Sequence, residues 1–245
     1  MRISRLYTDA RLAPGVELHL DQQVGHYVFR VLKLRAGDPV VLFNGDGADY
    51  AAELLSNRRD QVTLRVTARL PALAESPLAI TLVQAVSKGD RMDLSLQKAT
   101  ELGVSAVQPL FSERTEVRLT DERLLRRSEH WQRVLNSACE QCGRARVPEL
   151  REPMDLDEWL ASPAEGARIV LEPNAGQALA ALELQASAVA LVVGPEGGFS
   201  ERELKCMQLA GVRALSLGPR ILRTETAGPA AIAILQALYG DLGGR

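Results

Sequence analysis

The chain has 245 residues, of which 46% are hydrophobic and 24% charged, a composition typical of a globular protein long enough for one large domain or two smaller ones. The longest apolar runs, such as residues 186–193, are much shorter than the roughly 20 residues of a membrane span, and no apolar signal core follows the basic first residues. The odd number of cysteines, three, argues against a disulfide framework. We therefore expect a soluble cytoplasmic protein. The net charge of −2 does not by itself indicate a nucleic-acid-binding protein, but residues 152–212 hold ten acidic and three basic side chains, so the basic side chains elsewhere leave room for a polyanionic partner on one face.

The first 70 residues predict a small β-barrel. Val16–Leu20 and Gln61–Leu70 alternate between apolar and polar side chains, as half-buried strands do. Asn44–Gly47 separates two apolar strands within residues 38–55 and predicts a hairpin turn. Gln22–Leu34 has the apolar spacing of a helix. Short strands at this density are typical of a small barrel.

The pattern changes at the Pro- and Ala-rich stretch Pro71–Ala79, so we expect a first domain over residues 1–72 and a second over residues 76–245. The second domain alternates between apolar strands and amphipathic helices, which predicts an α/β fold with a mostly parallel sheet. Two of the expected strands cover residues 78–86 and 104–110, and three more begin at Arg168, Ala188 and Arg213. The clearest helices cover Asp90–Leu102 and Asp121–Cys142.

Cys139 and Cys142 form a C-x-x-C pair near the end of the longer helix. Such a pair can be a redox site or half of a zinc site, but no two further ligands accompany it at a suitable spacing. Both sulfurs lie on the apolar stripe of the helix, so we expect them to pack in the core and predict no metal site.

Three strands of the second domain end in loops of unusual composition: LEPNAG from Leu171, VGPEGGFS from Val193, and LGPRILRTETAG from Leu217. In open α/β sheets, ligands bind outside the carboxyl ends of the strands. If these strands are neighbours, the three loops converge on one pocket.

The glycine-containing loop after Val193 lacks both the dinucleotide-binding and the P-loop fingerprints. Glu196 would repel a phosphate, so a neutral or cationic ligand with hydroxyl or amino donors fits better. Ser200 and Glu203 match a capping box and predict that a helix begins directly after the loop.

The segment RILRTETAGPAAIAILQAL predicts another helix start. Thr224 is expected to cap the helix and Glu225 to suit its positive end. Arg220 and Arg223 precede it, which places both signs of charge beside an apolar helix and exceeds what a cap requires.

Together these segments resemble the RsmE family of 16S rRNA uridine N3-methyltransferases. The similar stretches, in chain order, are HYVFRVLKLRAGD, QAVSKGDRMDLSLQKATELGV, PLFSERT, EQCGRARVPEL, GPEGGFSERE and LGPRILRTETA, and they are spread over nearly the whole chain. Cys142 departs from the family pattern, in which a small Ser-like residue is expected.

The resemblance implies an α/β domain of the SPOUT class with a deep trefoil knot, preceded by a PUA-like β-barrel that binds RNA, in a homodimer. It implies S-adenosylmethionine as the cofactor, 16S rRNA of the small ribosomal subunit as the partner, and N3 of a uridine in the decoding region, U1498, as the methyl acceptor. Two alternatives stay open: a SPOUT methyltransferase with another RNA target, and a non-catalytic RNA-binding factor for ribosome assembly.

The same resemblance implies that the three strand-end loops form the cofactor pocket. The expected cofactor contacts are Leu171, Glu172, Val193, Gly194, Glu196, Gly197, Gly198, Leu217, Gly218, Ile221, Leu222, Thr224, Thr226 and Ala227.

Methyl transfer to N3 of uracil requires removal of its proton, so a general base must lie within hydrogen-bond reach of that atom. We expect Glu225 or Glu196 to assist deprotonation and Arg223 to stabilise the developing uracil anion. Contacts to the ribose hydroxyls or to the cofactor amine are the alternative for each glutamate, and Glu172 and Glu101 are more remote acids.

RNA contacts are expected from basic side chains outside the acidic segment, and such contacts make binding dependent on salt. A plain surface charge is the alternative for each of them, and no histidine is assigned a catalytic role. The candidates are Arg30, Lys33 and Arg35 in the barrel and Lys88, Arg91, Arg114 and Arg144 in the catalytic domain.

Overall fold

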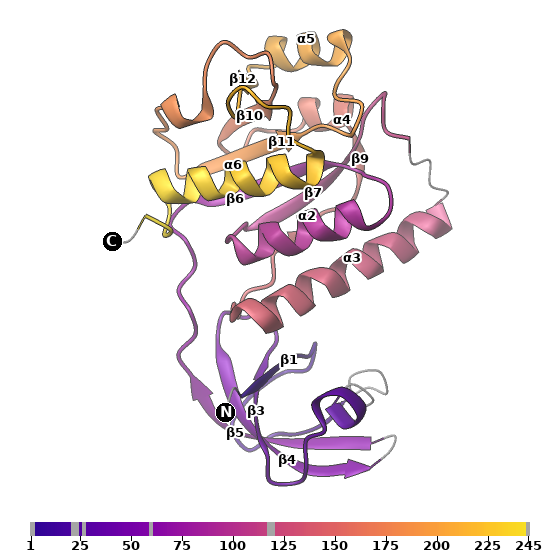
Figure 1. Ribbon diagram of the computed structural model, residues 1–245. Coiled ribbons are helices and arrows are strands. Elements are labelled where there is room, and N and C mark those ends of the chain that lie inside the picture. The colour runs from indigo at the N-terminus through magenta and orange to yellow at the C-terminus, as the bar shows by residue number, and fades with distance from the viewer. Residues whose placement is uncertain (1–2, 21–24, 26–27, 59–60, 117–120, 244–245) are drawn as a thin grey trace. The chain divides into compact units, whose positions relative to one another are not determined.

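The computed structural model describes residues 3–20, 25, 28–58, 61–116 and 121–243, which Figure 1 draws as a coloured ribbon. The chain divides into two compact units, one of residues 1–75 with 139–147 and one of residues 76–138 with 148–245. This division differs from the expected domains, residues 1–72 and 76–245, because the end of one long helix and the turn after it cluster with the first unit.

The first unit contains a curled sheet of five strands in the order β1 (Ser4–Tyr7), β3 (Pro39–Phe43), β4 (Asp49–Arg58), β5 (Gln61–Leu70) and β2 (Glu17–Leu20). β1 and β3 are parallel, and the other pairs are antiparallel. Alternate side chains of β5 fill the core as predicted, with Val62, Leu64 and Val66 buried. The hairpin between β3 and β4 is confirmed, and the sheet forms a half-barrel of the expected PUA-like kind.

The helix predicted over Gln22–Leu34 is described only in part. Residues 21–24 and 26–27 lie outside the described residues, and Val28–Leu32 forms a short π-helical segment, η1. The residues in and after η1 that were predicted to contact RNA, Arg30, Lys33 and Arg35, are exposed.

The second unit is built on a parallel sheet, which confirms the predicted fold class. Its strand order is β12 (Arg213–Leu215), β10 (Ala167–Leu171), β11 (Ala188–Val193), β6 (Ala79–Ala85), β7 (Ala106–Phe111) and β8 (Glu149–Leu150), and β9 (Met154–Asp155) also pairs with β7. Every pairing in this sheet is parallel. The two-residue strands β8 and β9 were not expected, because so short a segment carries no periodicity.

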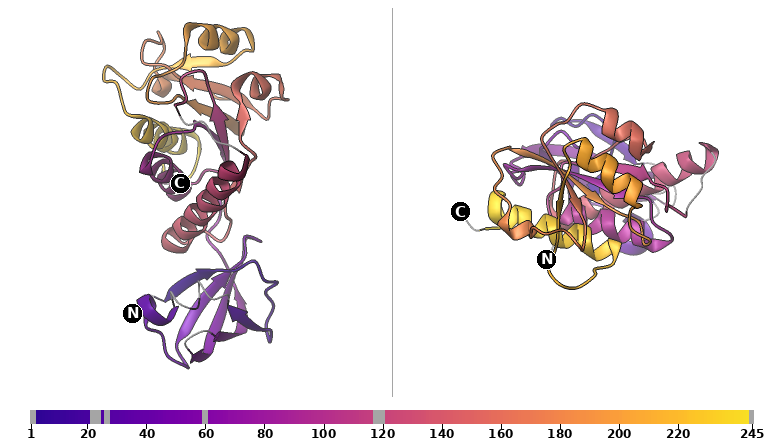
Figure 2. Two further views of the ribbon diagram at one scale, coloured as in Figure 1. Left: turned by 90° about the vertical axis from the view of Figure 1, so that its right-hand side faces the viewer. Right: turned by 90° about the horizontal axis from the view of Figure 1, so that it is seen from above.

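Helices cover both faces of this sheet. α4 (Leu156–Ala161) and α5 (Glu201–Leu209) bury Trp159 and Met207 against Val83, Val170 and neighbouring strand residues. On the other face, α2 (Asp90–Glu101) and α6 (Thr224–Tyr239) lie side by side, as Figures 1 and 2 show. In the described part of the chain, no helix is long and apolar enough to cross a membrane.

The predicted C-x-x-C pair lies in the last turn of α3 (Asp121–Cys142). Cys139 is fully buried, and its contact with the Cys142 thiol, together with burial, raises its pKa. Among the described residues, no group of three or more His, Cys, Asp or Glu side chains is arranged to hold a metal ion.

Candidate active site

The three strands with unusual loops are neighbours in the sheet. β10 pairs with β11 on one side and with β12 on the other, so their carboxyl ends lie together at one edge. A cavity of about 360 Å³ opens there, within the size range of small-molecule sites. Its lining residues are Arg91, Leu171, Glu172, Pro173, Val193, Gly194, Pro195, Glu196, Gly198, Phe199, Leu215, Leu217, Gly218, Arg220, Ile221, Leu222, Arg223, Thr224, Glu225 and Ala227.

The residues predicted to contact a cofactor line this cavity, with two exceptions. Gly197 and Thr226 do not line it; the Gly197 carbonyl accepts a hydrogen bond from Arg114 Nη1 at 2.8 Å, and Thr226 is exposed. Sequence reasoning missed Phe199 and Arg91, among others. Phe199 could have been found from its place in the loop, whereas Arg91 reaches the cavity from α2, far away in the sequence.

The glycine-containing loop makes a tight turn between β11 and α5. The Gly198 amide donates to the Pro195 carbonyl at 2.9 Å, and Gly198 has φ of 67°, a conformation that favours glycine. A Cβ atom on Gly194 would lie 3.1 Å from the Phe199 ring, so this position favours glycine because the ring packs directly against the backbone.

The predicted capping box is confirmed at the start of α5. The Glu203 amide donates to the Ser200 hydroxyl at 3.1 Å, and the Ser200 amide donates to the Glu203 carboxylate at 2.7 Å. The second carboxylate oxygen accepts from the Glu113 amide at 2.8 Å, although the Glu203 side chain is buried. Glu203 therefore joins the loop after β11 to the loop after β7.

Glu196 is held by Arg91 of α2 and by the backbone of Lys88, two residues before that helix. Its Oε1 atom accepts from Arg91 Nη1 at 2.7 Å and from the Lys88 amide at 3.3 Å. Burial acts to raise the pKa of this carboxyl, but the hydrogen bonds from Arg91 and from backbone amides outweigh burial, and the pKa lies below its ordinary value. A carboxylate so occupied is a weaker base.

Several residues predicted to contact RNA make contacts within the protein. Lys88 forms an ion pair with Glu116, and Arg91 and Arg114 bind the glycine-containing loop. All three nevertheless keep exposed or half-exposed side chains, and that of Arg91 lines the cavity.

Arg144 was also predicted to contact RNA. It is only 5% exposed, and its Nη2 atom lies 2.5 Å from Glu75 Oε2 within the first unit. A buried, paired guanidinium is used for packing its own unit, so the predicted contact with RNA loses its support.

The start of α6 also differs from expectation. Arg223 is the N-cap residue and Thr224 is the first helical residue, so Thr224 does not cap the helix. Instead its hydroxyl donates to the Gly194 carbonyl at 2.8 Å and accepts from the Gln84 amide at 2.9 Å. Thr224 therefore fixes the start of α6 against the ends of β11 and β6.

Glu225 lies in the first turn of α6 and faces the cavity. Its Oε2 atom is shielded from solvent and has no hydrogen-bond partner among the described residues. Glu172 also lines the cavity, but its Oε1 atom accepts from the Asn174 amide at 3.2 Å, and Glu101 pairs with Lys98 outside the cavity. Glu225 is therefore the carboxylate with the most free acceptor capacity at the site.

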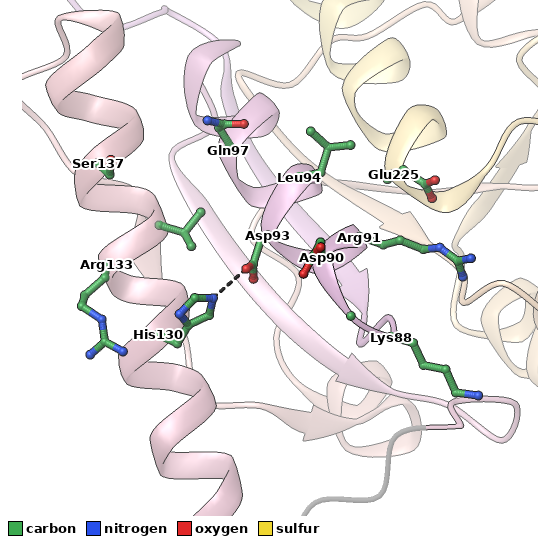
Figure 3. A pocket seen from close by; sticks show the side chains of 12 residues that line it. Lys88, Asp90, Arg91, Asp93, Leu94, Gln97, His130, Arg133, Ser137 and Glu225 are labelled. Atoms are coloured by element: carbon green, nitrogen blue, oxygen red, sulfur yellow. Dashed lines mark hydrogen bonds and ion pairs between the residues drawn. The ribbon is translucent and has the colours of Figure 1, made fainter.

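A second and larger groove, of about 960 Å³, adjoins this cavity. Figure 3 shows α2 lying between α3 and the start of α6: the His130–Asp93 pair, 2.6 Å apart, joins α3 to α2 on one side, and Glu225 lies on the other side. Arg91 and Glu225 line both the groove and the cavity, so the two spaces meet at these side chains. The site thus offers an enclosed space for one ligand and an open space for another, with a carboxylate between them.

Comparisons with known proteins agree with this arrangement. Residues 74–236 match the family described as RNA methyltransferase domain, and residues 20–67 match the family described as RNA methyltransferase PUA domain. The chain is 35% identical to ribosomal RNA small subunit methyltransferase E of Buchnera aphidicola subsp. Schizaphis graminum, over 98% of both chains. It is 30% identical to the protein of the same name from Bacillus subtilis, over 82% of both chains.

Two solved structures are similar over nearly their whole length. A putative methyltransferase from Legionella pneumophila, in complex with the cofactor S-adenosylmethionine, is 40% identical with a TM-score of 0.95, over 99% of this chain and 100% of that one. Ribosomal RNA small subunit methyltransferase E from Neisseria gonorrhoeae, bound to S-adenosylmethionine, is 38% identical with a TM-score of 0.90, over 98% of this chain and 99% of that one.

Proposed function

The chain belongs to the ribosomal RNA small subunit methyltransferase E family, and from this premise we propose that it transfers a methyl group from S-adenosylmethionine to N3 of a uridine in 16S rRNA. The observation that carries the proposal is the position of Glu225, whose shielded and unpartnered Oε2 atom lies where the cofactor cavity meets the larger groove.

The residues of the smaller cavity fit S-adenosylmethionine. Leu171, Leu222 and Ala227 offer apolar contact for an adenine ring, while Glu172 offers a carboxylate acceptor for hydroxyl or amino groups. Glu196 in the glycine-containing loop disfavours a phosphate at this wall of the cavity, which agrees with a cofactor that has no phosphate. When bound, this cofactor supplies an activated methyl group on a positively charged sulfur.

The chain's own residues prepare the acceptor. Glu225 Oε2 accepts the N3 proton of the uracil, which makes N3 nucleophilic. Arg223, at the N-cap of α6, is exposed in the same cavity and stabilises the negative charge that develops on the uracil. Glu196 stays ionised and paired with Arg91, and so fixes the glycine-containing loop in the wall of the cavity that would hold the cofactor.

The target, the assembly and the topology follow from family membership as further parts of the proposal. The acceptor is U1498 in the decoding region of the small subunit, so the protein acts in the cytoplasm, and it acts as a homodimer. A trefoil knot is supported by the path of the chain. After β12 at the sheet edge, it returns across β10 and β11, where Thr224 binds Gly194 and Gln84.

The direct test is a map of modified nucleotides in 16S rRNA from cells lacking the protein. We expect the loss of one N3-methyluridine near the decoding site, restored when the wild-type chain is supplied. An unchanged map, together with methylation of a different RNA by the purified protein, would support a SPOUT methyltransferase with another target. An unchanged map without binding of S-adenosylmethionine would support the non-catalytic assembly factor.

A further inference from the structure

The turn after β7, residues 112–115, lines neither the cofactor cavity nor the larger groove. Ser112 and Thr115 close it, since the Ser112 amide donates to the Thr115 hydroxyl at 3.0 Å and the Thr115 amide donates to the Ser112 carbonyl at 3.0 Å. Glu113 and Arg114 are its two central residues, and both contact the segment that follows β11. The turn can therefore act on the cavity through the glycine-containing loop.

Arg114 holds the middle of the glycine-containing loop. Its Nη1 atom donates to the Gly197 carbonyl at 2.8 Å, and a hydrogen bond from a charged donor is stronger than one between neutral groups. The stem of the same side chain packs on Gly197, where an added Cβ atom would lie 3.5 Å from Arg114 Cβ and 3.6 Å from its Cδ. Arg114 thus holds Gly197 from outside the cavity, whereas the neighbouring residues Glu196 and Gly198 line it.

Glu113 fixes the same turn to the start of α5. Its amide donates to the Glu203 carboxylate at 2.8 Å, and its own carboxylate forms an ion pair with Arg202. Hydrogen bonds from Ser200 and from Arg202 hold the pKa of the Glu113 carboxyl below its ordinary value, so the ion pair persists at neutral pH. Because its base is fixed in this way, Arg114 reaches the loop from a defined position.

The glycine-containing loop has its own local shape but needs support from outside to keep its position. Within the loop the Gly198 amide donates to the Pro195 carbonyl at 2.9 Å, a bond that does not involve Arg114. Such a turn can still tilt as a unit about its two ends. Arg91 holds it from α2, and Arg114 holds it from the turn after β7, so the two arginines restrain it from different elements.

We propose that Arg114 is a positioning residue for S-adenosylmethionine, which fixes the glycine-containing loop in the position that receives the cofactor. This inference rests on the proposed function, and it gives Arg114 a role different from the RNA contact expected from the sequence. A cavity wall that is in place before the ligand arrives lowers the cost of ordering when the ligand binds. Loss of the Arg114 hydrogen bond therefore weakens cofactor binding even when no RNA is present.

The test measures the affinity of the purified full-length protein for S-adenosylmethionine by calorimetry, without RNA. Arg114→Met keeps much of the apolar stem and removes the donor, whereas Arg114→Lys keeps a charged donor. We expect roughly tenfold weaker binding in Arg114→Met, as for the loss of one hydrogen bond from a charged group, and recovery of much of the affinity in Arg114→Lys.

A second readout separates positioning from general damage to the fold. In methylation of small ribosomal subunits, Arg114→Met should raise the KM for S-adenosylmethionine about as much as it weakens binding. The kcat at saturating cofactor should stay within about twofold of the wild type, because Arg223 and Glu225 lie at the start of α6 and not in the loop. Equal losses of affinity in Arg114→Met and Arg114→Lys, with kcat reduced in both, would overturn the inference.

The matched control is Arg213→Met, at an exposed arginine of β12 that lines neither space and donates to Gln177 Oε1 at 3.3 Å. It should leave the affinity for S-adenosylmethionine within about twofold of the wild type. Wild-type cofactor affinity in Arg114→Met would overturn the inference. If the same variant then binds small ribosomal subunits with a shallower salt dependence, Arg114 is a phosphate contact instead.

This design separates the two proposals. If the wild-type protein binds S-adenosylmethionine but does not methylate the subunits, the proposed reaction fails, while the Arg114 affinities measured without RNA still decide the inference. If methylation occurs and Arg114→Met has the KM and the cofactor affinity of the wild type, the proposed reaction stands and the inference fails.

Discussion

The side-chain amide of Gln84 donates a hydrogen bond to the hydroxyl of Thr224, 2.9 Å away, although 140 residues separate them in the sequence. Gln84 is fully buried at the end of β6, opposite Val193 of β11, and the Thr224 hydroxyl in turn donates to the Gly194 carbonyl. This chain of hydrogen bonds ties two strand ends to the first residue of α6. It sets the position of the neighbouring residues Arg223 and Glu225 in the cavity.

We predict that Thr224→Val lowers both stability and turnover. The valine removes the donor to the Gly194 carbonyl and one of the two acceptors of Gln84 Nε2, which keeps its bond to the Ala85 carbonyl, and this costs about 1–3 kcal/mol of unfolding free energy. Turnover should fall further than stability explains, because Glu225 and Arg223 lose their fixed position. Thr224→Ser keeps the hydroxyl and is the matched control. Urea unfolding and kcat of the two variants check the prediction, and equal kcat values in both would contradict it.

We predict that Glu225→Gln abolishes most of the turnover and leaves cofactor affinity nearly unchanged. The amide is similar in shape but cannot accept the N3 proton, and loss of a general base lowers rates by about 10²–10⁴-fold. Single-turnover methylation of small ribosomal subunits gives the rate, and calorimetry gives the affinity for S-adenosylmethionine. Glu101→Gln is the control, since Glu101 pairs with Lys98 and lines neither space. Full turnover in Glu225→Gln would rule out Glu225 as the base.

A pH-dependent prediction follows from the pair of Glu196 with Arg91. The pKa of Glu196 is lower in the folded protein than its ordinary value. The ionised carboxylate therefore adds to the free energy of unfolding, fully at pH values above the unfolded pKa of about 4.3, and this contribution is lost as the pH falls through the folded pKa. The difference in unfolding free energy between wild type and Glu196→Gln should therefore shrink as the pH falls below about 4. In an Arg91→Met background the difference should be smaller at pH values above about 4, where the carboxyl is ionised, and an equal difference there would contradict the assigned cause.

Local signals in the sequence predicted much of the scaffold. The hairpin at Asn44–Gly47 and the capping box of Ser200 and Glu203 each depend on residues only a few positions apart, and the structure contains both. The three strand-end loops could be placed at one pocket because parallel strands present their carboxyl ends to the same edge.

What the sequence could not predict are contacts between distant segments. Arg91 and Glu196 are 105 residues apart, so nothing in either local pattern indicated that the arginine holds the loop. Thr224 fits a cap by residue type, and only its contact with Gln84 in the fold reveals its different role. His130 carries no local signal either, because its partner Asp93 lies on another helix.

The last prediction concerns Glu203, a buried carboxylate that serves two loops. Glu203→Ala removes the acceptor of two backbone amides, those of Ser200 and Glu113. Hydrogen bonds to a charged group contribute roughly 1.5–3 kcal/mol to the free energy of unfolding. We expect the unfolding free energy to fall by about 2 kcal/mol or more. Glu201→Ala, at an exposed position in the same first turn of α5, is the matched control and should cost well under about 1 kcal/mol. Because the turn of Gly198 directly precedes α5, Glu203→Ala should also weaken S-adenosylmethionine binding. Similar unfolding curves for Glu203→Ala and Glu201→Ala would show that Glu203 does not fix the loop.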